Sequence, residues 1–239
     1  MVGKNNKNNI NNMKSINNYI SEKLVINRNT GKKQQYKYFP KTKDELKEII
    51  EQRINEEGNE CNLNDIDVSR INDMSWLFYD SEFNGDIFNW NVSNVEDMHS
   101  MFKDSKFNGD ISNWDVSNVK YMKSMFTNSN FNQDISNWDV SNVEYMNYMF
   151  TNSEFNQDIS KWDVGNVENM MSMFSFSKFN QNISNWNVSN VKDMSGMFRS
   201  SKFNQDISKW NVSNVKNMTK IFCNSILEGK EKKWWGRTK

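Results

Sequence analysis

The chain has 239 residues, and its 30 basic and 30 acidic side chains leave it without formal net charge. Balanced charge gives no general electrostatic reason to expect a nucleic acid or an anionic membrane as a partner. The sequence has no run of 18 consecutive apolar residues and no apolar core near its start, so we expect neither a membrane span nor classical secretion.

The first part of the chain is predicted to form a tail and a cap. Residues 1–32 are rich in Asn and Lys, with few apolar residues, and are predicted to be a disordered tail. Residues 33–58 are predicted to be an N-terminal cap, made of a strand that Pro40 ends and of a helix. Thr42 and Glu45 have the capping-box spacing that starts such a helix. Its apolar stripe consists of Leu46, Ile49, Ile50 and Ile54.

Residues 59–226 consist of about seven copies of a 24-residue repeat. A Trp recurs in each of six copies, at Trp90, Trp114, Trp138, Trp162, Trp186 and Trp210. Self-similarity at this period is the signature of a solenoid, in which each coil covers the open face of its neighbour. We therefore predict that equivalent indole and aliphatic side chains stack in register inside the array.

Within one repeat the pattern predicts one short strand and one short helix. Trp90 and Val92 are two residues apart and would share one face of a strand. Ser93 and Glu96 then have capping-box spacing. An apolar stripe with helical spacing follows, at Val95, Met98, Met101 and Phe102. The predicted fold class is therefore an α/β repeat, a solenoid with one strand and one helix per coil and a cap at each end.

The C-terminal segment, residues 227–239, has two interpretations. Its basic residues accompany Trp234 and Trp235. The two indoles either cover the last coil as a lid or belong to an exposed aromatic and basic docking tail.

Polar residues also recur in columns, for which we predict an architectural role. One acidic column consists of Asp86, Asp110, Asp134, Asp158, Asn182 and Asp206. We expect these side chains to cap turns, and calcium binding between stacked carboxylates is the alternative. A column of Asn without substitution, from Asn94 to Asn214, is expected to bond backbone groups at turns.

The sequence contains no recognisable catalytic, cofactor-binding or metal-binding motif. His99 is the only histidine, and we expect it to be a solvated surface residue. We therefore predict no catalytic residue, no cofactor and no metal ligand, in a protein that is not an enzyme.

A partner would be selected by the columns that vary from coil to coil. Tyr121, Tyr145 and Tyr148 lie in two variable columns beside the expected helical stripe, so they are expected to face outward. They either form one exposed aromatic patch or reflect scattered drift. Lys161 and Lys209 lie in a third variable column. The candidate partner-binding residues are Tyr121, Tyr145, Tyr148, Lys161, Lys209, Trp234 and Trp235.

The repeated unit, F-N-[GQ]-D-I-S-N-W-D-V-S-N-V-x-x-M-x-x-M-F, resembles the BspA-like leucine-rich repeats of bacterial surface proteins, including mycoplasma lipoproteins. It also resembles the Asn-rich versions found in giant DNA viruses of amoebae, and the lead-in F-P-K-T-K-D-E-L is similar to the segment that precedes the viral repeats. The resemblance covers residues 59–226 and implies a leucine-rich-repeat-like solenoid with a role in binding or adhesion. The sequence shows no signal peptide, lipobox-type Cys or wall anchor, which favours the viral version.

Together these observations predict a non-enzymatic repeat scaffold for protein–protein interaction between virus and host. Its expected location is intracellular, in the host cytoplasm or in the virion. The alternatives are a self-assembling structural component and a calcium-dependent repeat protein. The expected partner is a protein and not a nucleic acid, with self-association as the second option.

Overall fold

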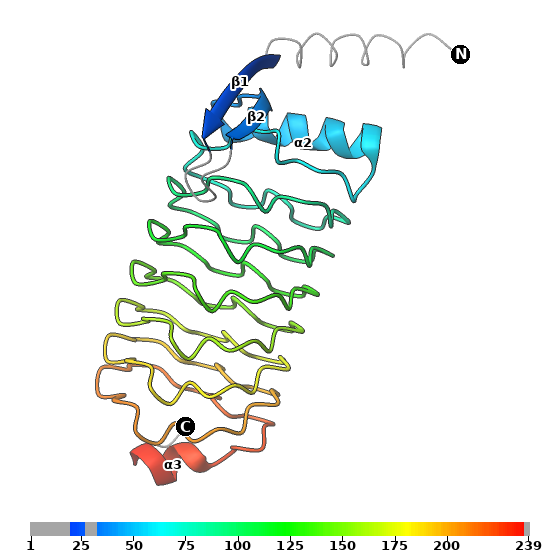
Figure 1. Cartoon of the computed structure of the whole chain (residues 1–239). Coiled ribbons are helices and arrows are strands. Elements are labelled where there is room, and N and C mark those ends of the chain that lie inside the picture. Colours follow the sequence, from blue (N-terminus) through cyan, green and yellow to red (C-terminus); the bar gives the residue numbers. More distant parts are fainter. Residues whose placement is uncertain (1–19, 27–32, 237–239) are drawn as a thin grey trace.

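The repeats form a stack of coils between two end elements, in a computed structural model that describes residues 20–26 and 33–236 (Figure 1). The elements in chain order are β1 Ile20–Ile26, β2 Lys33–Tyr38, α2 Lys43–Glu57 and α3 Lys230–Trp235. We number the coils from the first, residues 59–82, to the seventh, residues 203–226. The predicted disordered tail lies mostly outside the described residues, but its residues 20–26 form the strand β1.

The N-terminal cap contains both a strand pair and a helix. Strands β1 and β2 are antiparallel, and β2 also joins the first coil through a parallel pair of Tyr38 with Ile66. The side chain of Thr42 accepts a hydrogen bond from the backbone N–H of Glu45, at 3.2 Å, and α2 begins immediately after Thr42. Leu46, Ile49 and Ile50 of the apolar stripe of α2 are buried in the same core as the coils, and Ile54 is partly buried against it. The helix therefore covers the apolar end of the first coil.

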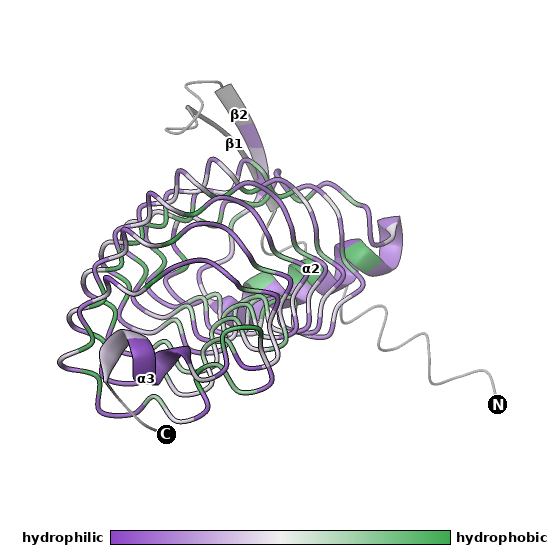
Figure 2. Cartoon of the chain, turned by 90° about the horizontal axis from the view of Figure 1, so that it is seen from below, coloured by the Kyte–Doolittle hydropathy of each residue, from purple (hydrophilic) through white to green (hydrophobic). Residues whose placement is uncertain are grey.

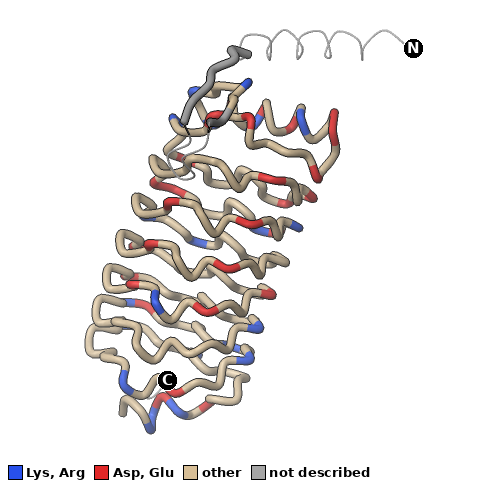
Figure 3. Tube along the Cα trace, viewed as in Figure 1, with Lys and Arg blue, Asp and Glu red and all other residues tan. Residues whose placement is uncertain are grey.

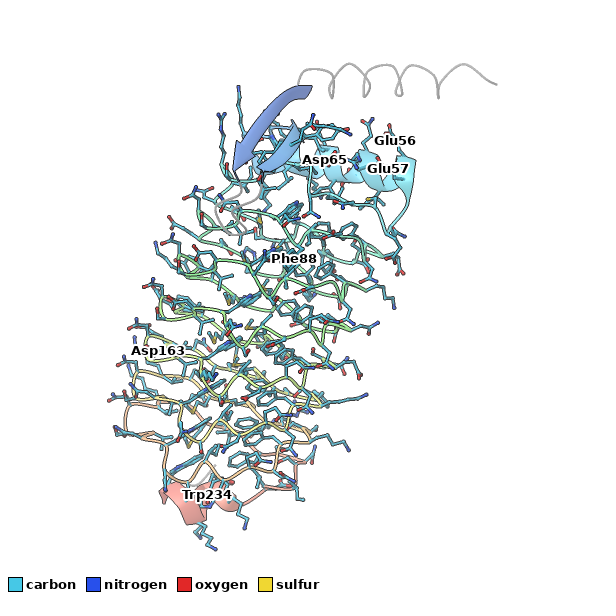
Figure 4. All side chains as sticks on the ribbon, viewed as in Figure 1. Glu56, Glu57, Asp65, Phe88, Asp163 and Trp234 are labelled. Atoms are coloured by element: carbon cyan, nitrogen blue, oxygen red, sulfur yellow. The ribbon has the colours of Figure 1, made fainter. Side chains whose placement is uncertain are left out.

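A buried arginine joins this cap to the first coil. Arg53 donates two hydrogen bonds from Nη1 to the carboxylate of Asp65, at 2.8 and 3.0 Å, and one from Nη2 to the carbonyl of Asn62. Its Nε donates to Glu57 at 2.6 Å, and Figure 4 shows Asp65 beside α2 and Glu57 near the helix end. Burial alone would lower the pKa of Arg53, but the hydrogen bonds with Glu57 and Asp65 outweigh it and raise the pKa.

Successive coils are in register along the whole stack. Parallel pairs link Asp73 with Asp97, Asp97 with Tyr121 and Tyr121 with Tyr145, and the series continues to Asn217. Each of these pairs joins residues 24 positions apart, which is the repeat length. Seen along the stack, the coils overlay one another (Figure 2). Equivalent residues of different repeats therefore form columns on the surface and layers in the core.

The described residues between α2 and α3 contain neither the predicted helix nor the predicted strand of each repeat. Where the helix was expected, the backbone N–H groups of Met98, Ser100 and Phe102 donate to carbonyl groups of the third coil, at 2.8–3.0 Å. The intervening N–H groups close tight turns within the coil, as when Met101 donates to the carbonyl of Met98 at 3.2 Å. The apolar stripe with the spacing i, i+3 and i+6 is therefore produced by consecutive turns and not by a helix.

Left-handed residues separate these turns and exclude a helix. Ser100 and Asp104 have φ of 56° and 60°, and the equivalent residues of the other coils also have positive φ. An α-helix requires negative φ at every residue, so two such residues four positions apart end it. The strand predicted at Trp90 is absent. The coils are instead linked by single paired residues, which recur regularly in the column of Asp97.

Aromatic ladders fill the core between the layers. The rings of Phe102, Phe126 and Phe150 stack at centroid distances of 5.7 Å, and Trp90 stacks on Trp114 at 6.4 Å. The indole N–H of each of the six repeat tryptophans, from Trp90 to Trp210, also donates to a carbonyl of the preceding coil; for Trp138 the acceptor is Ile111, at 3.1 Å. The conserved spacing of Trp therefore fixes the stacking distance through both packing and a directed hydrogen bond.

Candidate binding groove

We call the residues that pair between successive coils, such as Asp97, Tyr121 and Tyr145, the paired column. Buried residues on either side of each paired residue fix the outer surface that this column forms. Within the repeat, Val95 and Met98 are buried and flank the paired residue Asp97. The backbone N–H two residues after the paired position often bonds its side chain, as in Asp97 with His99 and Asn169 with Met171. This local turn presents the side chains of the paired column and of the column two residues later on one surface.

Two tyrosines of this surface are stacked. Tyr121 and Tyr145 occupy the paired column in the third and fourth coils, with ring centroids 5.5 Å apart and an interplanar angle of 19°. Tyr121 is 41% exposed, although the neighbouring Met122 is completely buried. The sequence left open whether the tyrosines form one surface patch or reflect scattered drift, and in the structure the register of the coils brings Tyr121 and Tyr145 into contact.

A groove of about 330 Å³ adjoins the stacked tyrosines. Its lining comes from the paired column and from the column two residues later, in the second, third and fourth coils: Asp97, His99, Tyr121, Lys123, Tyr145 and Asn147. No single repeat could form this groove, because each coil contributes two of its six residues. Sequence reasoning missed His99, Lys123 and Asn147. Their spacing of two residues from the tyrosine column was the signal that could have identified them.

One side of the groove is held by a chain of polar contacts through His99. Its Nδ1 lies 2.8 Å from Oδ1 of Asp97, and its Nε2 accepts a hydrogen bond from the indole Nε1 of Trp76, at 2.6 Å. Because an indole N–H can only donate, Nδ1 carries the ring hydrogen and donates it to Asp97. His99 was expected to be a solvated surface residue, but it is half-buried and both ring nitrogens have partners. The ring is therefore a fixed wall of the groove.

Further aromatic residues extend this surface toward the first coil. Trp76 packs edge-on against Tyr79, with centroids 5.0 Å apart, and both are exposed. Nζ of Lys103 lies 4.9 Å from the ring centroid of Tyr79 and 5.8 Å from that of Trp76. This cluster, which contains Trp76, Tyr79 and Lys103, joins the groove through the Trp76–His99 contact.

Tyr148 lies outside the groove. It has φ of 62°, and its hydroxyl donates to Sδ of Met171 in the next coil, at 3.5 Å. Its column was expected to face outward, but its members differ, because Ser100 and Ser124 are buried whereas Trp76 is exposed. The three tyrosines therefore do not all line one groove.

Lys161 and Lys209 are exposed but also lie outside the groove. They belong to the fifth and seventh coils, and the sixth coil separates them. Lys161 is close enough to Asp158 to contribute to lowering the pKa of that carboxyl, behind the larger effect of the hydrogen bond from the backbone N–H of Ser160. These two lysines lie near members of the acidic column, Lys161 near Asp158 and Lys209 near Asp206, and they do not line the groove beside the tyrosines.

Trp234 and Trp235 belong to α3 and pack on the last coil. Trp234 meets the ring of Phe222 edge-on and Trp235 stacks on it, each at a centroid distance of 5.9 Å. Figure 4 shows Trp234 at the C-terminal end of the stack. Both indoles are partly buried against the core. Their contacts match the lid interpretation of this segment and not that of an exposed docking tail.

The side chains of the acidic column accept hydrogen bonds from backbone N–H groups at turns. Oδ1 of Asp134 accepts the N–H of Ser136 at 2.9 Å, and Asp158 and Asn182 bond the equivalent serines in the same way. These hydrogen bonds lower the pKa of Asp134 and Asp158. Among the described residues no group of three or more His, Cys, Asp or Glu is arranged to hold a metal ion.

The side chains of the Asn column donate hydrogen bonds to backbone carbonyl groups of the preceding coil. The side-chain Nδ2 of Asn142 donates to the carbonyl of Ser117 at 2.7 Å. The same hydrogen bond recurs in all six copies, from Asn94 to Asn214. The expected bonding of backbone groups at turns is therefore present, and these amides are engaged in holding the stack together.

Comparison with known proteins identifies one related family. Residues 45–154 and 127–235 each match the profile of the family described as Mycoplasma protein of unknown function, DUF285. The two matches overlap and together span the second half of the N-terminal cap, all seven coils and most of the C-terminal segment. No curated protein and no solved structure matches the chain. In the part of the chain that the structure describes, every helix is too short or too polar to cross a membrane.

Proposed function

We propose that this chain, which belongs to the DUF285 family of Mycoplasma proteins of unknown function, is a non-enzymatic repeat scaffold that binds a protein partner. The observation that carries the proposal is the groove beside Tyr121 and Tyr145. Exposed aromatic side chains are enriched at protein interfaces, and a preformed stack loses little conformational freedom on binding. The rigid ladder behind the groove would hold it in a fixed shape.

The proposal also covers the fold and the viral-type membership that the sequence resemblance implies. We infer that the stack is a leucine-rich-repeat-like solenoid in which turns replace the usual helix, and that it works as an Asn-rich, viral-type member inside a host cell or a virion. The Asn-rich, alanine-free composition supports this assignment. A non-catalytic role is supported by His99, whose two ring nitrogens are both engaged, and by the polar columns, which bond the backbone.

Affinity capture from the native cell tests the proposal. The bait would be the intact chain, compared with a Tyr121→Asn/Tyr145→Asn double variant. Asn already occupies the same column at Asn169 and Asn217, so the stack should accept it. We expect a protein that binds the intact chain and is lost from the double variant, followed by direct binding of the two purified proteins.

Tyr148→Ser is the matched control, because Tyr148 is a partly exposed tyrosine outside the groove. Its captured proteins should equal those of the intact chain. Equal capture by the double variant would remove the groove as the binding site, and loss of the partner from the Tyr148 variant would place binding elsewhere on the stack.

A further inference from the structure

Three of the four exposed aromatic rings among the described residues have a lysine or arginine of the same chain over them. Lys103 lies over Trp76 and Tyr79, and Cζ of Arg199 lies 5.5 Å from the ring centroid of Phe176. These three aromatic residues and Tyr121 are the exposed ones among the described residues. Of the four, Tyr121 is the one over which no described lysine or arginine lies. The groove therefore leaves open an aromatic face of the kind that the chain elsewhere fills with a cation.

The open face of Tyr121 is directed toward an acidic side chain. Because the coils stack in order, Tyr145 covers the face of Tyr121 on the side of the fourth coil. The other face is on the side of the second coil, where Asp97 is the paired residue and lines the groove. Oδ1 of Asp97 is bonded by His99, whereas Oδ2 has no hydrogen-bond partner among the described residues. An aromatic face and a carboxylate oxygen thus border the same space.

The coils around the groove add a favourable field for a cation. Residues 59–154, the first four coils, contain sixteen acidic and five basic residues, a net charge of −11. Residues 179–239 contain four acidic and eleven basic residues, a net charge of +7. Figure 3 shows acidic residues concentrated in the upper coils and basic ones toward the lower end. The neutral total of the chain therefore hides an acidic half, and the groove lies in it.

We propose that the groove binds an arginine side chain of the protein partner, stacked on the open face of Tyr121 and paired with Oδ2 of Asp97. This inference rests on the proposed function and names the chemistry of the partner at the same groove. A guanidinium is planar, remains charged, stacks on aromatic rings and donates to carboxylates, which a lysine ammonium does less well. The partner segment is accordingly basic, and its binding weakens as salt is added.

Lys123 gives this proposal its sharpest test. It lines the groove and opposes a cation, since like charges repel. Replacing it with Gln removes the charge and keeps a polar side chain of similar length. Binding of an arginine should therefore tighten in Lys123→Gln, by about two- to fivefold at low salt. An acidic or sugar-like ligand, which would use the lysine as a donor, would bind more weakly to the same variant.

The experiment is an NMR titration of the full chain with a blocked Gly-Ser peptide that carries one central arginine. A matched peptide carries citrulline, which has the same planar shape without the charge. We expect the arginine peptide to shift signals of groove residues and to bind about tenfold more tightly than the citrulline peptide. Tyr121→Asn should remove this preference, and Asp97→Asn should reduce it by about threefold or more.

Both substitutions use a residue that the column already contains. Asn169 and Asn217 accept the backbone N–H two residues later, as Asp97 does, so the local turn is kept. Equal binding of the two peptides, an undiminished preference in Tyr121→Asn, or weaker binding in Lys123→Gln would each overturn the arginine site. If one of these results occurred while capture of the partner still depended on Tyr121 and Tyr145, the scaffold function would stand with a partner of different chemistry. Loss of that dependence would instead overturn the proposed function.

Discussion

The helix α2 and residues 95–105 of the second coil have the same kind of apolar stripe, yet only α2 is a helix. In α2 the backbone bonds are local, as when Leu46 donates to the carbonyl of Thr42 four residues earlier. In the coil, Met98 and Ser100 donate to residues of the next coil. Alternate backbone N–H groups of this segment have an equivalent partner one coil away and the others close tight turns, so the segment does not need the local bonds of a helix. An apolar stripe alone therefore does not distinguish the two structures.

The strongest test of the layered half of this comparison is Trp138→Ala. The substitution would leave a cavity within the aromatic ladder and remove the hydrogen bond to the carbonyl of Ile111. We expect the free energy of unfolding to fall by about 3–5 kcal/mol. Urea denaturation followed by circular dichroism would measure it.

Trp138→Phe separates packing from hydrogen bonding at this site. It keeps most of the apolar volume but removes one of the two donors to the carbonyl of Ile111, which the backbone N–H of Trp114 still bonds at 3.2 Å. The expected loss is smaller, about 0.5–1.5 kcal/mol. A loss below about 0.5 kcal/mol in the alanine variant would be typical of a surface residue and would contradict the buried indole.

Glycine substitutions should sharpen the comparison, because they are expected to have opposite signs in the two regions. Ser200 has φ of 53°, a conformation in which the Cβ atom is strained, so Ser200→Gly should stabilise the stack by about 1 kcal/mol. Lys47 is exposed within α2, where glycine is a poor helix former, so Lys47→Gly should destabilise by about 1 kcal/mol. Thermal unfolding of the two variants measures both effects.

Lys47→Ala is the control for the lost side chain, whose ion pair with Glu51 is exposed and long at 3.9 Å. It should unfold close to the parent chain, since such a pair contributes little. Glycine effects of the same sign at the two sites would mean that the coil segment tolerates helical backbone after all.

The sequence identified the period, the buried columns and the cap helix, because these depend on which side chains must leave water. It did not identify the secondary structure within the coil. The stripe of Val95, Met98 and Met101 is shared by a helix and by consecutive turns, which differ in their backbone bonding partners and in the positive φ of residues such as Ser100. One signal was present, since the column of Asp104 consists mainly of Asp, Asn and Ser, and Asp and Asn tolerate positive φ better than most residues.

The groove was predictable in part for a similar reason. The repeat length places Tyr121 above Tyr145, and this follows from the sequence once the coils are in register. The roles of Trp76 and His99 do not follow from it, because their contact joins two different columns, 23 residues apart. Tyr148 was grouped with the other tyrosines because its column was expected to lie on the same helix surface, whereas the structure places it outside the groove, with its hydroxyl on Met171.

Acid unfolding offers the smallest expected effect and compares carboxylate with amide at one turn. Hydrogen bonds from Ser136 and Ser160 lower the pKa of Asp134 and Asp158 below the ordinary value of 3.8. A group whose pKa is lower in the folded state stabilises it fully above the unfolded pKa. This contribution is lost as the pH falls through the folded pKa. The two turns should therefore weaken below about pH 4.

Asn182 forms the same turn without a charge, so Asp134→Asn/Asp158→Asn should keep the geometry and lose the acid sensitivity. Unfolding by urea would be compared at about pH 6 and about pH 2.5 for the parent chain and the double variant. We expect the parent to lose more stability between the two values, by less than about 1 kcal/mol per residue, because both carboxylates are exposed and screened by water. An equal loss of stability in both proteins would mean that the backbone N–H bonds a carboxylate no better than an amide. The acidic column would then add charge to the stack without adding stability.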